Sequence, residues 1–245
     1  MAKARLVGSI PAKRAATMGE ISETIVSSRL PRPHTSQADP SQLMATTPLE
    51  KSISICTLVF NHHQEITMTT ITVPTREEVS VRNQALFDDL KKGLGMVPNL
   101  YATFALSETA LATYLALQNA KSSISGKARE VVNLVVSQVN ECEYCLAAHT
   151  MLGKLNGFTD EQIIEIRHGQ ASFDTKLDAL TRLIKGITQS RGHIDQALVE
   201  AFFAAGWTKE NLVDAIVIIG DKTVSNYLHS TTKVPVDFAV APKLD

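Results

Sequence analysis

The stretch EVVNLVVSQVNECEYCLAAH, residues 130–149, holds both the main fold signal and the main chemical signal of this chain. Its first half is an apolar run that predicts a helix ending near Asn140-Glu141. Cys142 then opens a second helix, on which Cys142, Cys145 and His149 stand at positions i, i+3 and i+7 and share one face. Two thiols on one face can cycle between dithiol and disulfide beside an imidazole.

Glu130 fits the same picture if the chain reverses between the two helices. Antiparallel packing would bring it back alongside His149, because the two arms span about 15 and 10 Å at the α-helical rise. The two lengths agree to within one turn. The predicted constellation is therefore Glu130, Cys142, Cys145 and His149.

The residue types predict a proton relay. A free thiol has a pKa of about 8.5. The first turn of a helix favours the thiolate, because the helix dipole is positive at that end. His149 can take the proton directly or through water, and Glu130 can hold the imidazole in the required tautomer. Cys145, the nearer of the two to His149, is expected to be the attacking thiol. Cys142 is expected to be the resolving thiol, exposed in the first turn and accessible to an external reductant.

Composition narrows the class of protein. The chain has 245 residues with 44% hydrophobic and 20% charged residues, which are values typical of a globular protein. Its net charge of −1 gives no electrostatic case for binding nucleic acid, and no apolar run reaches the length of a membrane span. Three cysteines, two of them close neighbours, do not form a secreted disulfide framework. We expect a reducing, cytoplasmic location, with organellar import by the N-terminal segment as the alternative.

Residues 1–67 differ from the rest of the chain. Five prolines and frequent Ser and Thr interrupt them, so we expect a poorly ordered N-terminal extension. The early basic residues, with no acid before Glu20, are compatible with a transit peptide, and a mis-assigned start is the alternative. Cys56 lies in this segment and is expected to be a bystander.

Residues 68–245 are predicted to form one helical domain. Apolar spacing close to 3.6 residues recurs from Thr75 onwards, and helix boundaries are marked by Thr159 with Gln162 and by Gly169. A last long helix is predicted from Thr208 onwards, followed by an extended tail. No alternation of strand and helix is found. The sequence therefore predicts an all-α bundle of about eight helices.

These residues resemble a known family. Glu130, Cys142, Cys145 and His149 match the pattern E-x11-C-x-x-C-x-x-x-H of the alkylhydroperoxidase D-like proteins, within the carboxymuconolactone decarboxylase-like superfamily. Residues 95–100 and the tail from Asn226 also resemble its peroxidase-related branch. The resemblance covers about residues 70–240. Tyr144 departs from the pattern, because family peroxidases often carry histidine between the cysteines.

The resemblance implies an all-helical thiol peroxidase that assembles as a homo-trimer or homo-hexamer. It implies that Cys145 is peroxidatic and Cys142 resolving, with Glu130 and His149 as the proton relay. It implies a hydroperoxide substrate and a thiol reductant, such as a lipoyl carrier protein or a peroxiredoxin. No cofactor and no metal are expected.

Other interpretations of the cysteine pair stay open. The two thiols could be buried small residues at helical spacing, or could bind zinc together with His149 and Glu130, although structural zinc sites usually use two separated ligand pairs. A non-enzymatic redox sensor or metal-binding helical oligomer is therefore one alternative. A carboxymuconolactone decarboxylase-like enzyme is another, although decarboxylases of this superfamily lack the cysteine pair.

Overall fold

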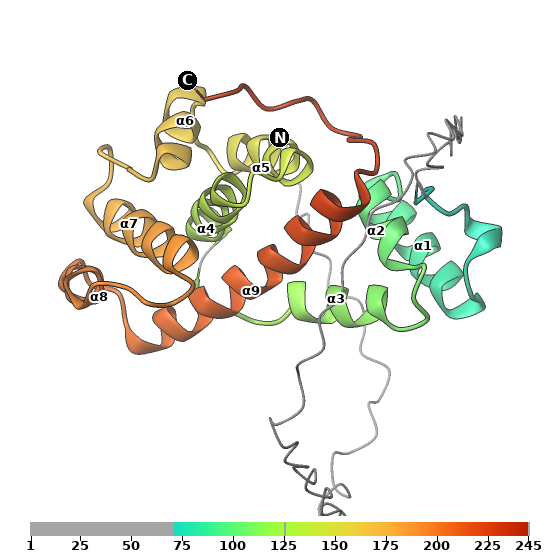
Figure 1. The fold of residues 1–245 in the computed structure, drawn as a ribbon, viewed down its shortest axis with the longest axis horizontal. Coiled ribbons are helices and arrows are strands. Elements are labelled where there is room, and N and C mark those ends of the chain that lie inside the picture. The colour runs from blue at the N-terminus through green and yellow to red at the C-terminus, as the bar shows by residue number, and fades with distance from the viewer. Residues whose placement is uncertain (1–70, 125, 245) are drawn as a thin grey trace, which may run out of the picture. The chain divides into compact units, whose positions relative to one another are not determined.

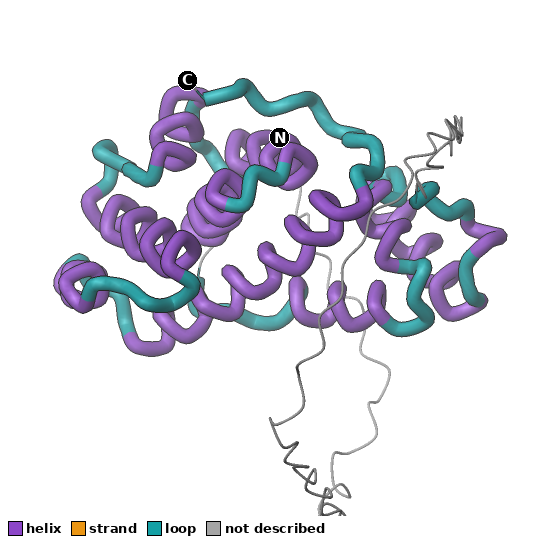
Figure 2. Tube along the Cα trace, viewed as in Figure 1, coloured by secondary structure: helices purple, strands orange, loops and turns teal. Residues whose placement is uncertain are grey.

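The computed structural model describes residues 71–124 and 126–244, which fall within one compact unit. Within these ranges all regular structure is helical (Figures 1 and 2), which confirms the predicted all-α class. The prediction for residues 1–67 lies outside the described residues. In the described part of the chain, nine α-helices follow a 3-10 turn at Arg76–Glu78, close to the eight expected: α1 Val81–Leu94, α2 Asn99–Phe104, α3 Ala110–Gln118, α4 Gly126–Val139, α5 Glu143–Leu155, α6 Asp160–His168, α7 Thr175–Ser190, α8 Gln196–Ala204 and α9 Lys209–Thr232.

Local capping signals set several of the helix ends. Thr159 begins α6 through a capping box with Gln162, and Thr208 begins α9 through a capping box with Asn211. Gly169 ends α6 with a φ of 91°, a left-handed conformation that glycine adopts without steric cost. These boundaries lie where the sequence predicted them.

Helix α4 is the centre of the main core. It packs against α5, α6, α7 and α9, and its apolar side chains are buried around most of the helix. Figure 1 shows α4 enclosed between α5, α7 and α9. The fully buried apolar side chains of α4 longer than alanine are Val131, Val132, Leu134, Val135 and Val136. A helix that is apolar on most sides must be covered on most sides, so the other helices are arranged around it.

A second core cluster lies at the start of α5. It joins α1, α2 and α3 to both cysteines and to Val234 of the tail. The tail beyond α9 is not helical, in agreement with the extended tail that was predicted. The Asp237 carboxylate binds it to the start of α2, because its Oδ2 accepts the backbone N–H of Asn99 at 2.6 Å. This cluster covers the thiols.

The long helix α9 presents an unexpected face to the core. Its existence is confirmed, but of the six apolar residues that predicted it only Ile219 and Leu228 are buried or partly buried. The other four, Val213, Ile216, Val217 and Val224, are exposed. The buried face carries polar groups in its second half: Asp221, Lys222, Ser225, Asn226, His229 and Thr232. Within the part of the chain described, no helix is both long and apolar enough to cross a membrane.

Candidate functional site at the α4–α5 reversal

Two adjacent residues, Glu141 and Cys142, end α4 and begin α5. Glu141 adopts a left-handed φ of 53°, and the backbone N–H of Cys142 donates to the carbonyl of Ser137 at 3.0 Å while that of Glu141 donates to Gln138 at 3.1 Å. This is the pattern of a Schellman motif, which satisfies the last carbonyls of α4. Cys142 is also the N-cap of α5, where its Sγ accepts the backbone N–H of Cys145 at 3.4 Å. The reversal therefore fixes the position of both sulfurs.

Both cysteines are free thiols and both are buried, with 0% of Cys142 and 3% of Cys145 exposed. The prediction that Cys142 is exposed in the first turn is wrong. The cluster formed by α2, α3, Tyr144 and the tail covers this end of α5, and α9 packs against the same helix. A helix N-terminus is open to solvent only where no other element is packed over it.

The structure brings Glu130 and His149 together. His149 Nδ1 lies 2.7 Å from Glu130 Oε2, and both side chains are buried. Asn133 Nδ2 donates to the other carboxylate oxygen at 3.2 Å. The contact with Glu130 occupies Nδ1 and leaves Nε2 as the ring nitrogen for proton transfer.

The electrostatic environment of Glu130 favours the carboxylate. Burial acts to raise the pKa of Glu130, but the charge and hydrogen bond of His149, together with the charge of Lys222, outweigh burial and lower it. A carboxylate that stays ionised can stabilise an imidazolium beside it.

The two thiols are electrostatically unequal. A hydrogen bond from the Cys142 thiol lowers the pKa of Cys145 to about 5, and the charges of Lys222 and His149 act in the same direction against burial. The same hydrogen bond and burial raise the pKa of Cys142. Cys145 therefore carries the negative charge of the pair while Cys142 keeps its proton.

Helix α9 supplies site residues that the sequence analysis did not identify. Ser225 Oγ lies 3.8 Å from Cys145 Sγ. A hydrogen bond from Asn226 acts to lower the pKa of each thiol, although the pKa of Cys142 remains raised. The Oδ1 of Asn226 accepts from Asn140 Nδ2 at 3.0 Å. The available signal was the recurrence of polar residues at intervals of three and four along α9, the spacing of a single helix face.

Tyr144, between the two cysteines, is a buried structural contact. Its hydroxyl accepts the backbone N–H of Leu100 at 3.3 Å, and its ring lies 5.3 Å from the ring of His229 and 5.4 Å from that of Phe238. Burial raises the pKa of Tyr144, so its hydroxyl stays protonated. The side chain ties α5 to α2 and the tail.

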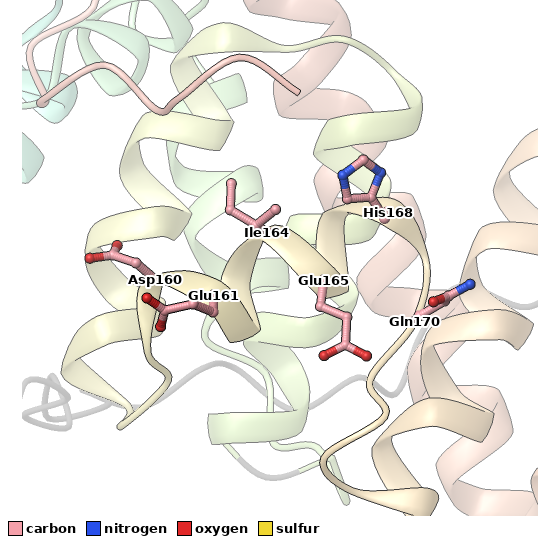
Figure 3. A pocket seen from close by; sticks show the side chains of 6 residues that line it. All are labelled: Asp160, Glu161, Ile164, Glu165, His168 and Gln170. Carbon is pink, nitrogen blue, oxygen red and sulfur yellow. The ribbon is translucent and has the colours of Figure 1, made fainter. Parts of the chain in front are cut away.

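A surface hollow along α6 lies apart from these residues (Figure 3). It is lined by Asp160, Glu161, Ile164, Glu165, His168 and Gln170, none of which belongs to the predicted site. Two of its carboxylates already have partners, because Asp160 pairs with Lys154 at 2.6 Å and Glu165 accepts the backbone N–H of Ser172. Among residues 71–124 and 126–244, no group of three or more His, Cys, Asp or Glu side chains is placed to hold a metal ion.

One family model matches part of the chain. Residues 106–183 match the model of the carboxymuconolactone decarboxylase family, a range that contains both cysteines, Glu130 and His149. No curated protein sequence matches the chain at a significant level.

Solved structures share the fold. An uncharacterized peroxidase-related protein from Silicibacter sp. TM1040 is 22% identical, with a TM-score of 0.61 over 70% of this chain and 91% of that one. The alkylhydroperoxidase AhpD core of a peroxidase-related protein from Ralstonia eutropha JMP134 is 18% identical, with a TM-score of 0.60 over 66% and 88%. The debrominase Bmp8 is 15% identical, with a TM-score of 0.58 over 69% and 92%. The predicted resemblance to the alkylhydroperoxidase D-like fold is confirmed.

Proposed function

We propose that this chain, whose residues 106–183 belong to the carboxymuconolactone decarboxylase family, is a thiol-dependent peroxidase that reduces hydroperoxides through Cys142 and Cys145. The observation that carries the proposal is geometric: two reduced thiols lie one helical turn apart at the start of α5, on the helix whose His149 contacts Glu130 at 2.7 Å. Cys145 has a pKa lowered to about 5, and Cys142, whose pKa is raised, is in hydrogen-bond contact with it. A nucleophilic thiolate beside a protonated thiol is the arrangement that a two-cysteine peroxidase requires.

The first step forms a sulfur–oxygen bond. The Cys145 thiolate attacks one peroxide oxygen, the O–O bond breaks, and the alcohol, or water in the case of hydrogen peroxide, leaves with a proton from the His149 imidazolium. Sulfur is oxidised to the sulfenic acid and the hydroperoxide is reduced to the alcohol. Glu130, 2.7 Å from His149, holds the ring and stabilises its cation before the proton is given up.

The second step closes the disulfide. The Cys142 thiol attacks the sulfenic sulfur, the S–S bond forms, and water leaves with the proton that Cys142 had kept. A dithiol donor then reduces the disulfide and is itself oxidised to a disulfide. We propose a lipoyl carrier protein or a peroxiredoxin as that partner, in a reducing compartment such as the cytoplasm.

Burial of the thiols restricts the substrate and the reductant. A cysteine that is only 3% exposed admits small oxidants more readily than large ones, because a bulky hydroperoxide would have to displace the second core cluster. A protein reductant needs the covering elements to open locally. We therefore propose hydrogen peroxide and small alkyl hydroperoxides as substrates.

The test is hydroperoxide consumption by the purified chain with dihydrolipoamide as the reductant. We expect turnover in the wild type, its loss in Cys145→Ser, and in Cys142→Ser a single turnover that ends at the sulfenic acid. Cys56→Ser is the control and should keep full turnover. Peroxide consumption that is unchanged in Cys145→Ser, or absent in the wild type, would overturn the proposal.

We also propose that the chain forms a homo-trimer or homo-hexamer. The supporting observation is the outer face of α9, where Val213, Ile216, Val217, Val224 and Tyr227 are exposed. Exposed apolar stripes of this kind are typical of protein interfaces. Light scattering should give a mass of three or six chains, and Ile216→Glu should lower it; a monomeric wild type would contradict the proposal.

A further inference from the structure

Helix α9 buries a lysine beside the thiols. Lys222 is only 2% exposed, although lysine is almost never fully buried unless it is paired. A buried charge is unfavourable unless an opposite charge offsets the loss of its hydration. Its counter-charge therefore has to be found among its neighbours.

The position of Lys222 on α9 directs it to the α4–α5 reversal. It stands one helical turn before Ser225 and Asn226, the two α9 residues next to the sulfurs, and residues three and four apart share a face. Ser225 Oγ donates to the backbone carbonyl of Lys222 at 3.0 Å and lies 3.8 Å from Cys145 Sγ. This turn of α9 therefore lies beside the nucleophilic sulfur.

The carboxylates near Lys222 have other cations. Asp221 lies 3.8 Å from Arg129, and Glu130 is in contact with His149 at 2.7 Å. The two basic residues of α5 also have acidic partners, because His149 faces Glu130 and Lys154 pairs with Asp160. The charge that remains for Lys222 to balance is the Cys145 thiolate.

The field of Lys222 reaches groups on three helices. Its charge lowers the pKa of Cys145 on α5 and of Glu130 on α4, and it acts to lower that of Tyr101 on α2. Burial still leaves the pKa of Tyr101 raised, and that of Tyr114 on α3 is raised as well, so these phenols stay neutral. The facing groups that can carry charge are therefore Glu130, His149, Asp221 and Cys145.

We propose that Lys222 is a positioning residue of the thiol site, and that its buried ammonium group is the counter-charge that holds Cys145 as a thiolate. The inference rests on the proposed function, because it assigns how the attacking sulfur is kept ionised. It also has a redox consequence. Closing the disulfide removes the thiolate and leaves Lys222 without its counter-charge, so the lysine stabilises the reduced pair and makes the disulfide more oxidising.

The first test is a titration of thiolate absorbance in a chain where Cys145 is the only cysteine. Cys56→Ser and Cys142→Ser remove the other two, and serine at 142 keeps a hydroxyl that can donate to Cys145. Adding Lys222→Met should raise the midpoint by at least about one pH unit, a tenfold loss of thiolate stabilisation. Lys222→Arg keeps the charge and should stay close to the parent value.

A matched control and a second neutral variant keep the titration interpretable. Lys209→Met removes an exposed charge from the start of the same helix and should leave the midpoint unchanged. If Lys222→Met fails to fold, as judged by circular dichroism, Lys222→Gln takes its place. A folded neutral variant that titrates like its parent would overturn the inference.

The second test measures the equilibrium between the cysteine pair and dihydrolipoamide in otherwise wild-type protein. Lys222→Met should shift the equilibrium at neutral pH towards the disulfide by about tenfold, matching the shift in thiol pKa. An unchanged equilibrium would contradict the redox consequence. Neither test requires turnover, so absent peroxidase activity would remove the proposed function while these tests still decide the role of Lys222.

Discussion

Cys145 should keep its reactivity in mild acid, where an ordinary cysteine loses it. With a pKa lowered to about 5, about 99% of this sulfur is thiolate at pH 7, against about 3% for a cysteine with a pKa of about 8.5. Thiolate nucleophilicity falls with pKa, with a Brønsted coefficient of about 0.4–0.5, so a shift of about 3.5 units slows attack on a disulfide about 25- to 55-fold. At pH 7 the two effects nearly cancel.

The difference emerges on acidification. At pH 5.5 about three-quarters of Cys145 is still ionised, whereas an ordinary thiol is only about 0.1% thiolate. After the loss in nucleophilicity is included, Cys145 should react about 14- to 30-fold faster than an ordinary cysteine of equal exposure. Burial slows attack by a similar factor at every pH, so the shape of the profile is the diagnostic quantity.

The assay follows mixed-disulfide formation by mass spectrometry between pH 4 and pH 9, with a small disulfide that has no titratable group in this range. The chain carries Cys56→Ser and Cys142→Ser, so no second cysteine of the chain can attack and remove the adduct on Cys145. We expect a rate that is nearly flat from pH 9 down to about 6, with a midpoint near the pKa of about 5. A rate that already falls tenfold per pH unit below pH 8 would refute the thiolate assignment.

Three further predictions concern the acid, the core and the tyrosine. Folding lowers the pKa of Glu130 below its unfolded-state value of about 4.3, so the carboxylate stabilises the fold above that pH. This stability is lost as the pH falls through the pKa of the folded state. Glu130→Gln should therefore reduce the decrease in urea midpoint between pH 6 and pH 3.5. Phe202→Ala should lower the unfolding free energy by about 3–5 kcal/mol, because Phe202 is fully buried and stacked on Trp207. Phe203 is only partly buried, so Phe203→Ala should lower it less. Equal urea midpoints for the two variants would contradict this prediction. Tyr144→Phe leaves the Leu100 amide without its acceptor and should cost about 1–3 kcal/mol with the thiol titration unmoved, whereas a shifted titration would give Tyr144 a chemical role.

Local signals made much of the fold predictable. The ends of α6 and α9 follow from capping boxes at Thr159 and Thr208, whose hydrogen bonds span only three residues. The reversal after α4 follows from the break between the apolar run and Cys142. Because a reversal of fixed length sets the register of two antiparallel helices, the contact between Glu130 and His149 could also be anticipated from spacing.

Burial was not predictable in the same way, because it depends on elements distant in the sequence. The spacing of Val213, Ile216 and Val217 identified α9 as a helix, but periodicity alone does not say which face the protein covers. Lys222 and Asn226 lie inside because α4 and α5 supply the charges and hydrogen bonds that offset their desolvation. The thiols are also covered by distant parts of the chain, namely apolar segments about forty residues earlier and about ninety residues later.

The inequality of the two sulfurs follows from the backbone at the reversal. Cys142 is placed by the hydrogen bond that closes α4 and by the N–H of Cys145 that it caps, so its thiol lies against the sulfur one turn later and donates to it. Cys145 collects that donor together with the Asn226 amide and the Lys222 charge, and ionises. Serine is a commoner N-cap than cysteine and would satisfy the backbone equally well. Helix capping therefore does not explain a sulfur at 142, whereas the proposed disulfide with Cys145 requires one.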